Sequence, residues 1–330
     1  MRKTNSPSSI RDQLRKFLPS NHLLPALLIA ILCLSLFLSL STESFATSKS
    51  LVNLLEANSY RLILALGMLM VISSGGIDLS QGSIISLSAI LAALGMKQGL
   101  PVSLSVLIAL VSGALLGALN GLLINLTKLD AFILTLATSF MYRGLSLILT
   151  RGIPLTLLPA DFRNFAARDF LGMETGVGFA LLLLLILIPI YRFMPWGHYL
   201  RSLGGNAQAL ARSGVSVGAY RISAYAFSGF TAALAGLIIS ARLNSAEANA
   251  GMNMQVHAIC AVVMGGTPLE GGRGSLLGTF LAVILLGLVR QGLTILSVSA
   301  YYQEFITGGL LLAALIFAEL REVKTRPKNS

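Results

Sequence analysis

The chain has 330 residues, of which 55% are hydrophobic and 11% are charged, against about 25% charged residues in a typical soluble domain. With a mean hydropathy of +0.80, this composition excludes a soluble globular protein and indicates an all-α membrane protein with many spans. The net charge of +11 does not indicate nucleic-acid binding, because the 24 Lys and Arg lie mainly in short tails and loops.

The N-terminus has a basic segment followed by an apolar run over residues 23–40. This run is longer than the apolar region of a secretory signal, which spans about 7–15 residues, and no small-residue cleavage site follows it. We therefore expect residues 1–21 to form a tail and the apolar run to be an uncleaved first transmembrane helix.

Apolar segments continue along the chain, and a helix needs about 20 such residues to cross the hydrocarbon core. The third and eighth segments are short and adjoin Gly-rich breaks, so we expect them to be tilted, broken or re-entrant. The ten predicted spans are residues 22–41, 58–75, 82–96, 102–126, 131–150, 175–194, 217–241, 253–267, 274–297 and 302–320.

Basic residues predict the orientation of these spans. With the N-terminus inside, the inner segments hold fifteen Lys and Arg and the outer segments hold six. An excess on one side marks the cytoplasmic face. We therefore expect a membrane domain over residues 22–320 with both tails, 1–21 and 321–330, in the cytoplasm.

The first polar interruption lies between the second and third spans and includes Ser74, Gly75, Gly76, Asp78, Ser80, Gln81 and Gly82. A carboxylate at the centre of a membrane helix costs about 2.5–3.5 kcal/mol, which makes Asp78 a candidate for substrate contact. Alternatively, Asp78 and Ser80 cap the next helix. The predicted topology places this stretch at or near the cytoplasmic ends of the two spans, which favours capping without excluding substrate contact.

Two long connections join later spans. The outer one, residues 151–174, is polar enough to fold over the outer mouth or meet a partner, although a solvated loop is equally consistent with it. The inner one, about residues 195–217, predicts a short helix over residues 207–213, with Asn206 as its N-cap and Gly214 after its end. Its small residues, Ala207 and Ala211, suit docking into a groove on another protein, whereas contact with lipid alone is the alternative.

A second Gly-rich break follows the eighth span and contains Gly265, Gly266, Glu270, Arg273 and Gly274. It resembles the first break, with a Gly-Gly pair, one carboxylate and a Gly-Ser pair before a helix. Either chance or a shared need to break a helix explains the likeness. Arg273 is expected to pair with Glu270 or to offer its charge to a partner protein.

Polar residues inside the spans are interpreted as packing features. Asn120 and Asn125, with Gly113 and Gly117, predict close helix contacts with interhelical hydrogen bonds. Arg290 and Gln291 are expected to reach towards the lipid headgroups. The three histidines are scattered without a carboxylate or cysteine cluster, so no metal site is expected.

Four stretches in this order resemble the permease subunits of ribose-type sugar ABC importers, and together they cover about residues 50–320. They are Ser74-Gly75-Gly76-Ile77-Asp78-Leu79-Ser80-Gln81-Gly82-Ser83; residues 131–138 with Arg143-Gly144; residues 203–207 with 211–215; and residues 263–275 with 277–279. Gln81 departs from the family pattern, where a small apolar residue is usual, and so does Pro268-Leu269-Glu270.

The resemblance implies a ten-helix permease of a bacterial inner membrane that forms a homodimer or pairs with a paralogue. Two cytoplasmic ABC ATPases and a periplasmic sugar-binding protein would complete the importer. The coupling loop that docks on the ATPase would include Arg201, Gly205, Asn206, Ala207, Ala211, Arg212 and Gly214. No lysine of the chain follows a glycine, so the P-loop motif for ATP is absent, and ATP with Mg²⁺ is expected on the partner ATPase.

Two other classes of protein fit the sequence less well. An ion-coupled secondary transporter needs acids or histidines embedded in the membrane, and Asp78 is the single good candidate. An integral membrane enzyme needs paired carboxylates or an activated nucleophile, which the sequence does not offer. The leading hypothesis is therefore a permease for a neutral, hydroxyl-rich solute, whose identity the sequence does not specify.

Overall fold

We describe the chain from a computed structural model. It describes residues 23–167, 169–170, 172–299, 301–303, 305–306, 308–309, 312–313 and 316. Both predicted tails, 1–21 and 321–330, lie outside these residues, as does much of the tenth predicted span.

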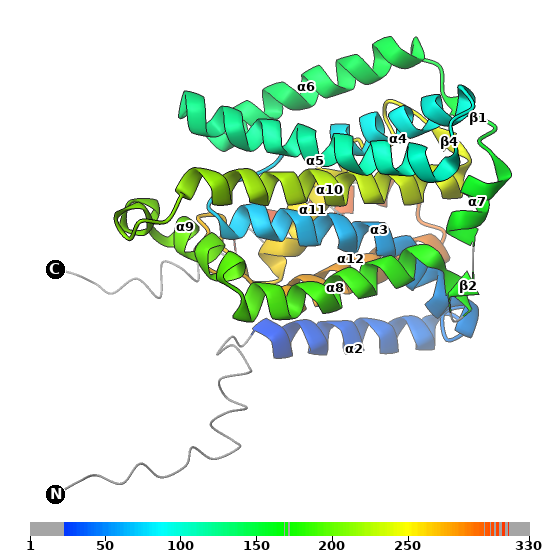
Figure 1. The fold of residues 1–330 in the computed structure, drawn as a ribbon. Coiled ribbons are helices and arrows are strands. Elements are labelled where there is room, and N and C mark those ends of the chain that lie inside the picture. The colour runs from blue at the N-terminus through cyan, green and yellow to red at the C-terminus, as the bar shows by residue number, and fades with distance from the viewer. Residues whose placement is uncertain are drawn as a thin grey trace, which may run out of the picture.

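Helices dominate the fold (Figure 1). Seven are long and apolar enough to cross a membrane: α2 (Leu23–Ser41), α3 (Ser48–Ser73), α5 (Val102–Thr127), α6 (Ala131–Thr150), α8 (Thr175–Phe193), α10 (Val217–Leu243) and α12 (Leu276–Ile295). Two apolar helices are shorter, α4 (Gln81–Lys97) and α11 (Met254–Met264). These two correspond to the short third and eighth predicted spans, while the predicted total of ten spans stays a prediction.

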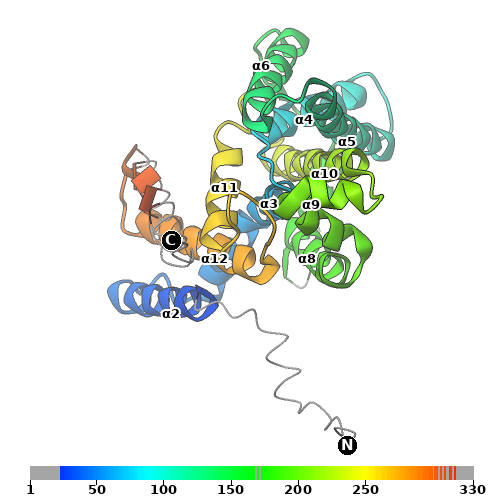
Figure 2. The ribbon, with the colours of Figure 1, turned by 90° about the vertical axis from the view of Figure 1, so that its left-hand side faces the viewer.

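The centre of the bundle is formed by α3 and α10. In each of them 72% of the apolar stretch is buried, whereas the value is 11% in α2, 22% in α5 and 28% in α6. Figure 2 shows α3 surrounded by α8, α9, α10, α11 and α12. The hydrophobic α2, α5 and α6 therefore turn most of their apolar surface outwards, as expected for helices that face lipid or another membrane subunit.

Glycines set the distance between α5 and α10. A Cβ atom at Gly113 would contact the carbonyl oxygen of Gly229, and one at Gly117 would collide with the carbonyl oxygen of Tyr225. The two backbones therefore approach more closely than larger residues permit. This confirms the packing role predicted for Gly113 and Gly117.

The connection between α6 and α8 folds onto one end of the bundle. It contains β1 (Leu155–Thr156), α7 (Ala160–Ala167), β2 (Asp169–Phe170) and β3 (Met173–Glu174). Strand β1 pairs antiparallel with β4 (Ser245–Ala246), and β2 pairs with β3. Leu158 and Phe162 are buried at this end, so the segment is a folded cover rather than a solvated loop.

Helix α9 (Pro195–Arg212) lies at the opposite end of the bundle (Figure 1). Its backbone breaks at Asn206, where φ is −161° and ψ is 93°. The Oδ1 atom of Asn206 accepts a hydrogen bond from the N–H of Ala209 at 2.9 Å, and Gly214 follows the helix with φ +81°. The cap and the terminator predicted for the short helix are thus confirmed, whereas its helical extension from Pro195 to Gly205 was not predicted.

Candidate functional site

The first Gly-rich break reverses the chain at the end of α3. Gly75 adopts φ +81°, a conformation that favours glycine, directly after the C-cap residue Ser74. The chain then runs back along α3, because Gln81 Nε2 donates to the carbonyl oxygen of Leu64 at 3.3 Å. Leu64 lies nine residues before the end of α3, roughly 14 Å along the helix axis. Helix α4 therefore begins well inside the bundle.

Asp78 lies on this returning segment and is completely buried. Its Oδ1 atom accepts hydrogen bonds from the Ser80 N–H at 3.0 Å and from the Ser80 hydroxyl at 2.6 Å. Its Oδ2 atom accepts one from the hydroxyl of Ser228, on α10, at 2.6 Å. Three donors thus satisfy the carboxylate, and no described Lys or Arg forms an ion pair with it.

The network continues into the neighbouring helices. Asn120, on α5, donates to the Ser80 hydroxyl at 2.7 Å and accepts from Tyr142, on α6, at 3.0 Å. The carbonyl oxygen of Ile77 accepts from Thr135, on α6, at 3.2 Å and from Tyr225, on α10, at 3.3 Å. One short extended segment therefore ties α4 to α5, α6 and α10.

These contacts correct two expectations about the first break. Asp78 does not lie at the ends of the spans, because its hydrogen-bond partner Ser228 lies eleven residues inside α10. Ser80 is the N-cap residue of α4, but its side chain makes no capping bond, because its hydroxyl donates to Asp78 instead. The carboxylate organises a buried polar network, and in this conformation it has no exposed surface with which to contact a substrate.

Gln81 and Gly82 have packing roles at the start of α4. Gln81 Nε2 donates to the Ser228 hydroxyl at 2.8 Å, while Gln81 Oε1 is buried without a hydrogen-bond partner. A Cβ atom at Gly82 would collide with the carbonyl oxygen of Gly251 and the side chain of Gln255. Gly82 therefore lets α4 approach the segment that leads into α11.

Three glycine-containing segments meet beyond the end of α3, and we call this contact the glycine junction: Ser73–Gly76, Gly204–Gly205 and Gly271–Gly272. The Gly272 N–H donates to the Ser73 carbonyl oxygen at 3.1 Å. A Cβ atom at Gly204 would collide with Ser73 O and Gly272 N, and one at Gly271 would lie 2.6 Å from Gly75 N. The structure thus brings together the first break, the second break and α9, which the sequence places far apart.

A second link joins α9 to the end of α3. The guanidinium group of Arg201 stacks 4.5 Å from the ring centroid of Tyr191, near the end of α8, and donates to the Tyr191 carbonyl oxygen. The Tyr191 hydroxyl lies 2.8 Å from the hydroxyl of Ser73. Arg201 therefore joins α9 to α8 beside the glycine junction, with its side chain partly exposed.

The outer piece of α9 is exposed, in contrast to its base. Leu200 and Leu203 are buried in the bundle. The residues of the predicted coupling loop that are exposed are Gly205, Asn206, Ala211, Arg212 and Gly214, while Ala207 is partly buried. The helix thus presents a surface of small residues and one arginine at the end of the bundle.

In the second break, the glycines lie close to neighbouring segments while the charged residues are exposed. Gly265 is the C-cap residue of α11, and a Cβ atom there would lie 2.5 Å from Thr279 N on α12. Gly266 has φ +93°, and a Cβ atom at Gly274 would lie 2.5 Å from the Ser73 hydroxyl. Glu270 and Arg273 are exposed. The two roles predicted for Arg273, pairing with Glu270 or offering its charge to a partner protein, stay predictions.

The sequence interpretation assigned no role in this network to Thr135, Tyr142 or Tyr225. Each is a single polar residue in an apolar helix, so its partner depends on which helices pack together. Asn120 was expected to form interhelical hydrogen bonds, which the structure confirms. Among the described residues no group of three His, Cys, Asp or Glu could hold a metal ion.

Comparison with known proteins places this architecture in a family. Residues 50–315 match the model of the family described as "Branched-chain amino acid transport system / permease component". This match covers both Gly-rich breaks and α9. No solved structure is significantly similar to the chain.

Curated relatives match most of the chain. The ribose import permease protein of Bacillus subtilis is 37% identical over 290 residues, covering 87% of this chain and 90% of the relative. The D-allose transport system permease protein of Escherichia coli is 35% identical, covering 88% and 90%. The autoinducer 2 import system permease protein of Photorhabdus laumondii is 32% identical, covering 92% and 90%.

Proposed function

This chain belongs to the branched-chain amino acid transport system / permease component family, and we infer that it is a ribose-type permease subunit that carries a sugar or sugar-like molecule. It is a multi-pass protein of a bacterial inner membrane. This assignment is supported by relatives at 31–37% identity, which are named as permeases for ribose, D-allose and autoinducer 2. A neutral, hydroxyl-rich solute also suits a membrane domain with few charges in its spans.

We propose that ATP drives this transport from another chain. This chain has no P-loop lysine, so ATP and Mg²⁺ would bind a cytoplasmic ABC ATPase. A periplasmic binding protein would deliver the sugar to the end of the bundle that carries α7 and the β1–β4 pair. With α9 at the opposite end, the two partners would have separate docking surfaces.

The glycine junction supports a specific role for α9. The exposed helix after Asn206 would dock on the ATPase, and the buried base of α9 contacts the end of α3 at Gly204. A displacement of α9 would therefore act directly on both Gly-rich breaks. Because backbone meets backbone there without an intervening side chain, little of the displacement would be absorbed by side-chain rotation.

A dimer, either with a second copy or with a paralogous permease, would cover part of the outward apolar surface. Helix α6 carries large exposed side chains on its outer face: Phe132, Ile133, Phe140, Met141 and Ile148. Lipid alone would also cover them, so the dimer rests on the ABC importer assignment rather than on this face.

An ion-coupled mechanism is not favoured. It would require Asp78 to exchange protons or ions with water on each side of the membrane. The carboxylate is enclosed by three hydrogen-bond donors and has no exposed surface. A path to it would have to break the network that joins four helices.

Reconstitution tests the proposal. The chain would be placed in proteoliposomes with an ABC ATPase and sugar-binding protein encoded with it, and uptake of labelled D-ribose and D-allose would be measured. Uptake should require ATP and the ATPase and should persist when the proton gradient is collapsed. Transport by the chain alone, or transport lost with the proton gradient while ATP is maintained, would contradict it.

A further inference from the structure

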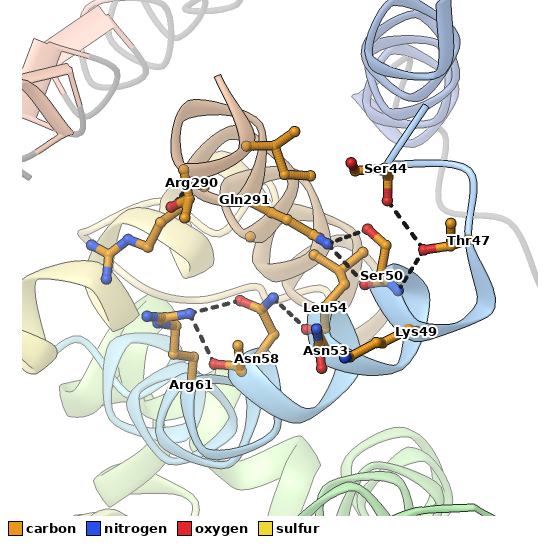
Figure 3. A pocket seen from close by; sticks show the side chains of 14 residues that line it. Ser44, Thr47, Lys49, Ser50, Asn53, Leu54, Asn58, Arg61, Arg290 and Gln291 are labelled. Atoms are coloured by element: carbon orange, nitrogen blue, oxygen red, sulfur yellow. Dashed lines mark hydrogen bonds between the residues drawn. The ribbon is translucent and has the colours of Figure 1, made fainter. Parts of the chain in front are cut away.

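A cavity of about 570 Å³ opens between the loop after α2, the first half of α3 and the end of α12 (Figure 3). It lies at the end of α3 opposite the glycine junction. A smaller void of about 30 Å³ shares Asn58, Arg61 and Arg290 with it and reaches His257, on α11. Together they form one recess between three helices, with arginine and amide side chains on its otherwise mostly apolar walls.

Cationic side chains line this recess. Arg61, from α3, and Arg290, from α12, place their guanidinium groups on the same side of the cavity, and Lys49 lies at the other side (Figure 3). No Asp or Glu is among the described residues that line either space. The closest acidic side chain on α3, Glu56, is engaged elsewhere, because it lies 4.0 Å from Arg242 and accepts from the Glu174 N–H at 3.1 Å.

The two arginines make contacts that leave their charges uncompensated. Arg61 donates to the Ala57 carbonyl oxygen at 2.8 Å and to Asn58 Oδ1 at 3.2 Å. Arg290 lies 3.3 Å from His257 Nε2. Neither forms an ion pair with a described carboxylate. Placing two guanidinium groups in one partly buried recess is unfavourable unless an anion joins them.

Polar groups on the opposite wall are fixed in place. Gln291 Nε2 donates to the Ser50 carbonyl oxygen at 2.8 Å and to the Ser50 hydroxyl at 2.7 Å, which holds the amide across the gap between α12 and α3. Its Oε1 atom is buried and has no hydrogen-bond partner. This unsatisfied acceptor lies beside the cavity, and a small shift of the Gln291 side chain would present it to a ligand hydroxyl. The N-terminus of α3 adds positive potential.

We propose that this recess binds a phosphate group that carries a hydroxylated substituent, as in a phosphatidylglycerol headgroup or a soluble phosphate ester. Arg61 and Arg290 bind the phosphate oxygens, since guanidinium groups match phosphate with paired N–H donors. Gln291 Oε1 accepts from the hydroxyl of the substituent. A neutral sugar would satisfy the glutamine but would leave the two arginine charges without a counter-ion.

Native mass spectrometry and binding titrations on the purified full-length chain test this site. The probes are dioleoyl-phosphatidylglycerol, dioleoylglycerol as the matched lipid without phosphate, and glycerol 3-phosphate as the soluble ester. The variants are Arg290→Gln, the double change Arg61→Gln with Arg290→Gln, and Arg143→Gln as the control. Arg143 is a partly exposed residue of α6 and donates to Asn249, outside the recess.

We expect one of the two phosphate probes to bind to the wild type and to bind at least about tenfold more weakly to Arg290→Gln. The double variant should bind more weakly still, and Arg143→Gln should match the wild type. Retention of phosphatidylglycerol over dioleoylglycerol identifies a lipid source, and saturable binding of glycerol 3-phosphate identifies a soluble one. If the double variant does not fold, the comparison of probe binding between the wild type and Arg290→Gln is sufficient to test the site.

The site would be disproved if the wild type retained phosphatidylglycerol no better than dioleoylglycerol and failed to bind glycerol 3-phosphate. Equal weakening in Arg143→Gln and Arg290→Gln would also disprove it, because the effect would then reflect total charge. None of these measurements depends on ATP or on sugar uptake, so the proposed transport function is tested separately.

Discussion

The two ends of α3 are built in opposite ways. At its C-terminal end, glycines bring three backbone segments into direct contact, and the buried Asp78 is enclosed nearby by three hydrogen-bond donors. At its N-terminal end, α3 and α12 separate around a cavity of about 570 Å³ lined by arginine and amide side chains. The same helix is therefore fixed where it meets α9 and open where it faces α2 and α12.

This difference indicates a division of roles along one helix. Close backbone contacts transmit displacement because they leave no space for side-chain rearrangement. A cavity of this size admits water or a ligand and tolerates changes in its lining. Substitutions of the same kind should therefore cost more at the closed end than at the open end.

The largest effect is expected for Asp78→Ala. It leaves three buried donors, from Ser80 and Ser228, without their acceptor, which should lower the free energy of unfolding by about 3 kcal/mol or more. Asp78→Asn keeps an acceptor for Ser80, and the Ser228 hydroxyl rotates to accept from the new amide, so about 1 kcal/mol is expected.

Thermal unfolding in detergent and ATP-dependent uptake would be measured for both variants. Near-normal uptake in Asp78→Asn with loss in Asp78→Ala is the expected outcome. Complete loss of uptake in both, with Asp78→Asn folded, would show that the negative charge itself is required.

The next effect is expected for Gly204→Ala at the glycine junction. The added methyl group collides with backbone atoms of Ser73 and Gly272, which should cost about 1–3 kcal/mol and abolish uptake. Gly205→Ala is the matched control, because a Cβ atom there would lie 3.9 Å from the nearest atom, Gly272 Cα. Equal effects of the two changes on uptake and unfolding would contradict a coupling role for this contact.

Gly287→Ala tests the open end with the same substitution. A Cβ atom there would collide with the side chain of Asn58 rather than with backbone. Because Asn58 borders the cavity, its amide can move into free space, and we expect a loss of about 1 kcal/mol in unfolding free energy with uptake retained. A cost equal to that of Gly204→Ala would remove the distinction between the two ends of α3.

The smallest effect is expected from pH at the ion-pair cluster of Glu56, Glu174 and Arg242. Burial raises the pKa of the Glu174 carboxyl above its ordinary value of 4.5; Arg242 opposes this shift and Glu56 adds to it. The folded protein thus holds this proton more tightly than the unfolded chain. The resulting stability is complete below pH 4.5 and is lost as the pH rises through the folded-state pKa.

Unfolding of the wild type and Glu174→Gln would be followed from pH 4 to pH 7. The pH-dependent difference between them should stay below about 1 kcal/mol, because the group is partly solvated. If the wild type instead became more stable relative to Glu174→Gln as the pH rose, the ion pair between Glu174 and Arg242 would dominate.

Sequence patterns were sufficient for features that depend on local composition. The apolar runs predicted where most helices lie, and Asn206 and Gly214 predicted the cap and the end of the outer piece of α9. The small residues Gly113 and Gly117 predicted close packing of α5. Each of these features depends on residues that are close together in the sequence, so it can be predicted without knowing which helices are neighbours.

Composition and motifs thus determined that the chain is a helical membrane permease of the ribose type, and they identified both Gly-rich breaks and α9 as distinctive segments. Only the tertiary structure decided that Asp78 is buried beside the middle of α10, that Gly75, Gly204 and Gly271 meet, and that Arg61 and Arg290 share a recess. The reason is physical. A polar side chain in an apolar helix indicates that a hydrogen-bond partner is required, and a glycine indicates a close backbone approach, but the packing of the helices decides which residue lies opposite.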